Sequence, residues 1–282
     1  MGSYSSSPPP EILPPQAENA PPRPPRPRRG WASAPATYLL VGINCAVFLL
    51  MVLRGAGIWM PTVDQIMYWG ADNAGNVLID GQWWRIVTAM FVHVGILHIA
   101  TNMWCLWNLG LLAEPLMGWF GLISVYILTG AAGNLLSTGW NWLHPLHDGG
   151  NIVFPAGAGA SGAVFGIAGA LIVLLKSKRL PIPQFELKRL RKSVIYFAAI
   201  NLVIGLSLDF GSGYTGIAID NSAHIGGFLC GLLFAVPLVP RIGSPRTMFQ
   251  TRMRLAVVAM VILLVLCGFY VAHIPPPQGL TF

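Results

Sequence analysis

The sequence predicts an all-α fold, a polytopic membrane bundle of seven helices. Hydrophobic residues make up 54% of the 282 residues and charged residues only 10%, whereas soluble domains carry about 25% charged residues. Apolar segments of spanning length recur along most of the chain, as expected of a multi-span membrane protein. The formal net charge of +7 comes without a basic face, interleaved aromatic residues or a binding module, so we expect no nucleic-acid partner.

The first segment, residues 1–35, is rich in Pro and Ser and contains no apolar run near its start. We therefore expect a disordered cytosolic tail that is rich in Pro and Arg, without a signal peptide. Its arginines gather near its end, at Arg23, Arg26, Arg28 and Arg29.

Seven apolar segments of spanning length follow the tail. The loop at about 55–94 contains several tryptophan and acidic residues, which predicts a structured, partly interfacial element rather than a plain linker. The fourth segment, about 16 residues long, is shorter than the roughly 20 that a full span needs. The seven segments cover residues 37–53, 95–112, 119–138, 160–175, 193–208, 222–239 and 255–273.

The positive charges predict the orientation of these segments. With the N-terminus in the cytosol, the inside loops hold fifteen of the seventeen Lys and Arg, and only Arg54 and Arg85 lie outside. This bias is typical of helical membrane proteins. It predicts a cytosolic N-terminus and a C-terminus outside, and it accounts for the basic composition without a polyanionic partner.

Unusual polar residues open three of the predicted helices, the second, fourth and sixth. In the predicted orientation these helices all begin on the outer side. His98 and Asn102 are spaced i,i+4 and share a face, Ser161 starts the fourth helix after a glycine-rich loop, and His224 lies early in the sixth. Since ionisable groups inside spans face the interior or a wet cavity, we expect these side chains to form one site in the outer half of the membrane.

Small residues would allow the fourth and sixth helices to approach closely. Gly162 and Gly166 form one Gly-x-x-x-Gly pair, and Gly227 and Gly231 form another, a spacing that permits tight backbone packing in membranes. His224 shares a stripe with the second pair. The histidine is therefore expected where its helix meets a close neighbour.

This combination indicates nucleophilic catalysis. A serine hydroxyl needs an imidazole to take its proton, and the imidazole can return that proton to the leaving amine. Ser161 would be the nucleophile and His224 the base. His98, Asn102 and the backbone N–H of Ser161 would stabilise the oxyanion, each donor contributing roughly 3–4 kcal/mol. Asp220 is the one carboxylate near His224, a turn earlier and at the water boundary, so the pattern favours a dyad over a triad.

Other interpretations of the same residues stay open at this point. Ser161 could serve only as an N-cap, and His98 and Asn102 could be interhelical hydrogen-bonding groups. His224 could be a proton relay in a transporter. No metal and no cofactor are expected, since the histidines give no ligand pair at i,i+4 and the cysteines lie in apolar segments without ligand spacing (Cys45, Cys105, Cys230 and Cys267).

The sequence resembles the rhomboid family of intramembrane serine proteases from about residue 38 to 240. Gly159-Ala-Ser-Gly162 resembles the family's Gly-x-Ser-Gly motif, and Ala223-His-Ile-Gly-Gly227 resembles the segment with its catalytic histidine. His98-Ile-Ala-Thr-Asn102 resembles the His-x-x-x-Asn stretch of the second helix, and Trp84-Arg85 resembles the Trp-Arg signature of the first loop. Glu114 falls where the family has an acidic residue after the second helix.

The resemblance implies a six-helix rhomboid core over residues 37–240, with residues 255–273 as a seventh transmembrane helix. It implies a Ser161–His224 dyad open to water from the outer side, no cofactor, and structural positions for Trp84, Arg85 and Glu114. Phe165 stands where some relatives have a tyrosine that packs on the histidine, and Phe can still stack.

The expected partners are the lipid bilayer and transmembrane protein substrates, cleaved within or next to their helices. The expected location is the cell membrane, plasma or inner. Two alternatives remain, a catalytically silent rhomboid-like protein that binds clients and, in a different class, an ion- or proton-coupled transporter.

Overall fold

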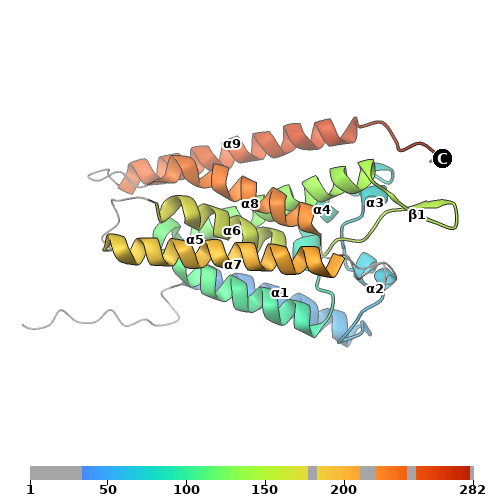
Figure 1. Cartoon of the computed structure of the whole chain (residues 1–282), viewed down its shortest axis with the longest axis horizontal. Helices are drawn as coiled ribbons and strands as arrows, with labels where there is room; N and C mark the ends of the chain where they lie inside the picture. Colours follow the sequence, from blue (N-terminus) through green and yellow to red (C-terminus); the bar gives the residue numbers. More distant parts are fainter. Residues whose placement is uncertain (1–33, 177–182, 210–219, 240–245, 280–282) are drawn as a thin grey trace, which may run out of the picture.

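The computed structural model describes residues 34–176, 183–209, 220–239 and 246–279, with residues 201–209 and 246 described as helical backbone only. Nearly all of the predicted tail over residues 1–35 lies outside these ranges. The described part is a bundle of long helices that run along a common direction (Figure 1). They are α1 (Pro35–Leu53), α5 (Ile96–Leu143), α6 (Ser161–Leu174), α7 (Gln184–Asp209), α8 (Asn221–Ala235) and α9 (Arg246–Ala272).

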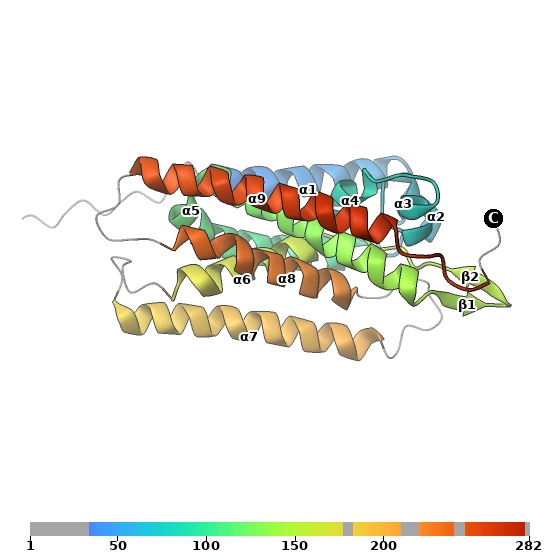
Figure 2. The ribbon, with the colours of Figure 1, turned by 90° about the horizontal axis from the view of Figure 1, so that it is seen from above.

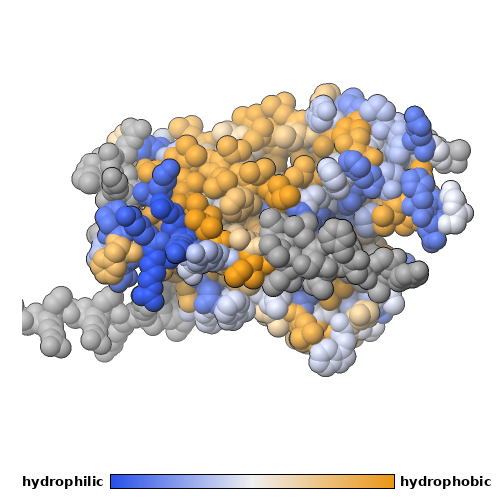
Figure 3. Space-filling view, viewed as in Figure 1, coloured by the Kyte–Doolittle hydropathy of each residue, from blue (hydrophilic) through white to orange (hydrophobic). Residues whose placement is uncertain are grey.

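Four helical segments in the described ranges are long and apolar enough to cross a membrane: Pro35–Leu53, Ile96–Leu143, Asn221–Leu238, which includes the short helix η4 (Val236–Leu238), and Thr247–Ala272. Helix α6 is apolar but shorter, as predicted. Hydrophobic side chains form a broad band over the middle of the bundle, and hydrophilic side chains gather toward its ends (Figure 3). This is the surface of a helical membrane protein, whereas the count of six helices plus one stays a prediction.

The predicted second and third helices both fall within α5. Gly118 interrupts this helix with φ 76° and ψ 169°, a conformation that only glycine adopts readily. The two halves of α5 run in opposite directions along the bundle on either side of this residue (Figure 1). Helix α9 begins at Arg246, earlier than the predicted 255.

The loop at 55–94 is structured, as the sequence predicts. It contains α2 (Val63–Tyr68), α3 (Ala74–Leu78), α4 (Arg85–Thr88) and the 3-10 helix η3 (Ala89–Phe91). The guanidinium of Arg85 holds the loop together, because it donates to the carbonyl oxygens of Met67 and Ala71 at 2.8 Å each and to Gln82 Oε1 at 2.7 Å. The same guanidinium lies 4.6 Å from the ring centroid of Trp84, a cation–π contact.

Glu114 caps a neighbouring helix. Its carboxylate accepts hydrogen bonds from the backbone N–H groups of Ala36 and Thr37 at 2.9 and 2.8 Å, and from the hydroxyl of Thr37 at 2.7 Å. These groups belong to the first turn of α1, where a helix has unpaired N–H groups and favours negative charge. Glu114 therefore ties α5 to the start of α1, which is a structural role.

One element departs from the all-α prediction. Strands β1 (Leu146–Asp148) and β2 (Asn151–Val153) form an antiparallel hairpin after α5. Gly149 and Gly150 make its turn with φ of 56° and 85°, the backbone that a two-residue hairpin needs. The Asp-Gly-Gly-Asn stretch already carried this signal.

Helices α6 and α8 lie side by side in the centre of the bundle, as two perpendicular views agree (Figures 1 and 2). A Cβ added to Gly227 would lie 2.0 Å from the carbonyl oxygen of Gly162, and one added to Gly231 would lie 1.9 Å from that of Gly166. The four glycines thus bring the two backbones into direct contact, as their spacing predicts.

Candidate active site

Ser161 and His224 meet across the contact between α6 and α8. Ser161 is the first residue of α6, and His224 lies in the first turn of α8. The Nε2 atom of His224 is 2.9 Å from Oγ of Ser161, within hydrogen-bonding distance. Ala160 is the N-cap of α6 and no side chain caps the helix, so Ser161 does not act as an N-cap here.

The ring of His224 is held from one side by an aromatic stack. The centroids of His224 and Phe165 are 4.4 Å apart, with an angle of 13° between the planes. Phe165 comes from the same helix as Ser161, one turn later. The stack therefore fixes the orientation of the imidazole toward the serine, and the expectation that Phe can stack here is confirmed.

The other ring nitrogen of His224, Nδ1, is buried and has no hydrogen-bond partner among the described residues. The nearby carboxylate of Asp220 is engaged elsewhere: it accepts from the backbone N–H of Ala223 at 3.0 Å and from the hydroxyls of Ser137 and Ser222. A triad would place a carboxylate on Nδ1. Asp220 is instead the N-cap of α8 and its link to α5, so the geometry favours a dyad over a triad.

His98 and Asn102 lie beside the glycine-rich loop that precedes Ser161. A Cβ added to Gly159 would be 2.9 Å from Nε2 of His98 and 3.8 Å from Nδ2 of Asn102. The backbone N–H of Val94 donates to Nδ1 of His98 at 3.4 Å, so a neutral ring carries its proton on Nε2. Two side-chain donor groups therefore lie against Gly159, whose φ of 127° also favours glycine.

His93 is a neighbour that the sequence interpretation missed. Its ring is fully buried and packs edge-on against that of His98 at 5.3 Å. Its Nε2 lies 3.5 Å from the backbone nitrogen of Ala160, directly before Ser161. His93 sits in a loop, where no helical spacing relates it to the other polar residues.

Asp72 is a second residue that the sequence did not indicate. Its backbone exchanges two hydrogen bonds with Gly157, at 2.7 and 2.8 Å, and its carboxyl group accepts from the hydroxyl of Thr138 at 3.0 Å. Burial raises the pKa of Asp72 to about 7, although the bond from Thr138 opposes the rise. Asp72 thus fastens the glycine-rich loop to the first loop and to α5.

A cavity of about 260 Å³ lies at this end of the bundle, next to the start of α8. Trp140, His144, Gly157 and Asp220 are among its lining residues, whereas Ser161 is not. Within the described ranges, no group of three His, Cys, Asp or Glu side chains could hold a metal ion. The absence of a cofactor stays a prediction.

Comparison with known proteins gives one consistent result. A family model described as "Rhomboid domain" matches residues 80–241. The chain is 28% identical to rhomboid protease GluP of Bacillus subtilis over 243 residues, which cover 86% of this chain and 41% of GluP. It is 29% identical to rhomboid protease AarA of Providencia stuartii over 209 residues, 72% of each chain. RHOMBOID-like protein 7 of Arabidopsis thaliana is 28% identical over 179 residues, covering 64% of this chain and half of that protein.

Proposed function

Since this chain belongs to the rhomboid family of integral membrane proteins, we propose that it is an intramembrane serine endopeptidase. It hydrolyses peptide bonds within or next to the transmembrane helices of other membrane proteins. The observation that carries the proposal is the 2.9 Å distance between Oγ of Ser161 and Nε2 of His224. Two of the relatives are named rhomboid proteases, which supports the same activity.

In the proposed mechanism Ser161 attacks the scissile carbonyl carbon while His224 takes the hydroxyl proton on Nε2. The tetrahedral intermediate collapses as His224 gives that proton to the leaving amine, and an acyl ester remains on Ser161. Water then attacks the ester with His224 as the base, and the acid product leaves. No metal or cofactor takes part.

The oxyanion that forms in both steps needs donors nearby. Nε2–H of His98 and the amide of Asn102 lie beside Gly159, and the backbone N–H of Ser161 is at the positive end of α6. The amide of Asn102 already gives one hydrogen to the carbonyl of His98 at 3.1 Å, and its second hydrogen is available for the substrate. We assign oxyanion stabilisation to these three donors.

Peptide hydrolysis needs water, which the hydrocarbon core excludes. The proposed site lies at the start of α6 and α8, toward the end of the bundle that carries the structured loop. In the proposed topology of six core helices plus α9, this is the outer end, the N-terminus is cytosolic, and the C-terminus is outside the cell membrane. Small or helix-breaking residues in a substrate near this face would favour cleavage, because they reduce the cost of local unwinding.

The test compares wild type with Ser161→Ala and His224→Ala in liposomes that contain a single-span reporter. We expect cleavage near the outer face by wild type only. A serine-reactive fluorophosphonate should label wild type and neither variant, because labelling requires an activated hydroxyl. Equal cleavage by all three proteins would contradict the dyad.

The same experiment separates the rival functions. A silent client-binding protein would retain the reporter without cleaving it and would not be labelled by the fluorophosphonate. A proton-coupled transporter would instead take up solute into the same liposomes when a proton gradient is applied, and this uptake would survive Ser161→Ala. Either result would replace the proposal.

A further inference from the structure

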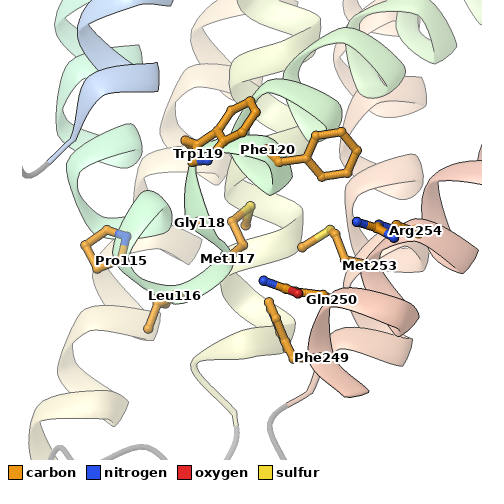
Figure 4. Close-up of a pocket in the computed structure, with 10 residues that line it drawn as sticks. All are labelled: Pro115, Leu116, Met117, Gly118, Trp119, Phe120, Phe249, Gln250, Met253 and Arg254. Atoms are coloured by element: carbon orange, nitrogen blue, oxygen red, sulfur yellow. The ribbon is translucent and has the colours of Figure 1, made fainter. Parts of the chain in front are cut away.

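A cavity of about 560 Å³ lies between the turn in α5 and the beginning of α9 (Figure 4). Met117, Trp119 and Phe120 line it from α5, and Phe249, Gln250 and Arg254 line it from α9. This volume is within the range of small-ligand sites, about 300–1,000 Å³. The start of α9, which lines this cavity, lies at the opposite end of the bundle from the β-hairpin (Figure 1).

The cavity has an amphipathic lining. Figure 4 shows the guanidinium of Arg254 and the amide of Gln250 on the side of α9 that faces the α5 turn. Most of the other lining side chains are apolar, and no carboxylate is among the described residues that line the cavity. Among these described lining residues Arg254 is the one cation, and it lies beside apolar and aromatic side chains, which fits a ligand that has an anionic group attached to a hydrocarbon chain.

The surroundings of the cavity identify such a ligand. Trp119 is 61% exposed and Phe120 42% exposed, and aromatic rings of this kind gather at the interface between lipid headgroups and hydrocarbon. Arg254 is eight residues after the start of α9, about 12 Å along the helix, from where a long side chain reaches the headgroup layer. Lipid is therefore the medium into which this cavity opens.

From these observations we propose that the cavity binds one anionic glycerophospholipid. Its phosphate would accept hydrogen bonds from Arg254 and Gln250, and an acyl chain would lie along the rings of Trp119, Phe120 and Phe249. The proposal does not depend on proteolysis. It gives α9 a role, because the lipid would join the seventh helix to the core where protein contacts leave a gap.

Charge argues against the N-terminal tail of the chain as the occupant. Residues 1–33 contain four arginines and two glutamates, so the tail is basic and would be repelled by Arg254. An anionic headgroup has the complementary sign. Basic residues near membrane surfaces attract anionic lipids in the same way.

The experiment uses delipidated full-length protein in a non-ionic detergent, with unfolding followed by tryptophan fluorescence. Phosphatidylglycerol and phosphatidylcholine of matched acyl chains are titrated separately, and inorganic phosphate is a third ligand. We expect phosphatidylglycerol to raise Tm well above the effect of phosphatidylcholine. Arg254→Gln should weaken the apparent affinity for phosphatidylglycerol about tenfold, the effect of losing one charged hydrogen bond.

Two further variants make the result specific. Arg252→Gln removes a charge of the same helix that does not line the cavity, and it should keep the wild-type preference. Gln250→Trp fills the cavity but keeps Arg254, and it should abolish the preference. The proposal is overturned if both lipids act equally on wild type, if Arg252→Gln weakens binding as much as Arg254→Gln, or if inorganic phosphate alone reproduces the shift.

Discussion

The contact between α6 and α8 and the contact between α5 and α9 are built on opposite principles. In the first, an added Cβ on Gly227 or Gly231 would reach a backbone oxygen at 2.0 or 1.9 Å. In the second, one on Gly139 would meet a side-chain atom of Val271 at 3.4 Å, and one on Gly121 would meet the terminal methyl group of the Met253 side chain at 2.6 Å. The first contact is between backbones and has no room to adjust, whereas the second is between side chains, which can move, and it lies beside a cavity.

The difference shows which helix contact must be held at a fixed distance. Ser161 and His224 come from two separate helices, so their 2.9 Å distance depends on how closely those helices approach. Backbone contact fixes that approach, since backbone atoms cannot change rotamer. Helix α9 contributes none of the predicted site residues, and its packing can be looser without changing that distance.

The largest expected effect comes from breaking the tight contact. Gly227→Val places side-chain atoms on the carbonyl oxygen of Gly162, which must force α6 and α8 apart and cost more than about 3 kcal/mol. We expect loss of the folded protein, or a folded protein without fluorophosphonate labelling. Gly268→Ala is the control in α9, where the new Cβ would meet only a side-chain atom of Trp83, at 3.7 Å, so this variant should not be destabilised. Equal melting temperatures for the two variants would contradict the comparison.

The structured loop before α5 should also respond to pH through Asp72. Its pKa is raised to about 7 by burial, so between about pH 4 and 7 the folded protein binds more protons than the unfolded chain. The free energy of unfolding should therefore fall as pH rises through this window, by roughly 2–4 kcal/mol.

Asp72→Asn is the matched variant for this test, because the amide keeps the size of the side chain but does not titrate. Its melting temperature should depend less on pH between 4 and 7 than that of wild type. The same pH slope in both proteins would assign the dependence to another group.

Gly159→Ala tests the approach of the glycine-rich loop to His98. The new Cβ would lie 2.7 Å from Cε1 of His98 and would require φ of 127°, so the oxyanion donors should shift. We expect kcat/KM for the reporter to fall about 100-fold, the loss typical of one oxyanion donor. Gly81→Ala has a positive φ of 69° but no atom within 4 Å, and it should leave kcat/KM unchanged.

The smallest expected effect distinguishes two contributions of Asp220 to stability, its hydrogen bond as the N-cap of α8 and its negative charge. Asp220→Ala removes the cap of α8 and should cost about 1 kcal/mol, whereas Asp220→Asn keeps the cap at little cost. Thermal unfolding measures this difference. If both variants are equally destabilised, the charge of Asp220 and its bond to Ser137 matter more than capping.

Much of the site could be predicted because it depends on the spacing of residues within single helices. The i,i+4 spacing places His98 and Asn102 on one helix face, and the Gly-x-x-x-Gly pairs predict the backbone contact that the structure contains. His93 and Asp72 could not be predicted, since both sit in irregular segments where sequence distance says little about position. The hairpin after α5 was not predicted for a different reason. Its short turn sequence directly follows a long apolar helix, and the hydrophobic segments alone were used to divide this part of the chain into elements.

The sequence by itself determined that the chain is a helical membrane protein of the rhomboid family, which helices carry the polar residues, and which glycines allow close packing. These properties depend on composition and on spacing within one helix. Only the tertiary structure decided that Asp220 binds Ser137 and Ser222 rather than Nδ1 of His224, and that α9 leaves a cavity beside Arg254. These features join residues far apart in the chain, and their distances are set by how whole helices pack.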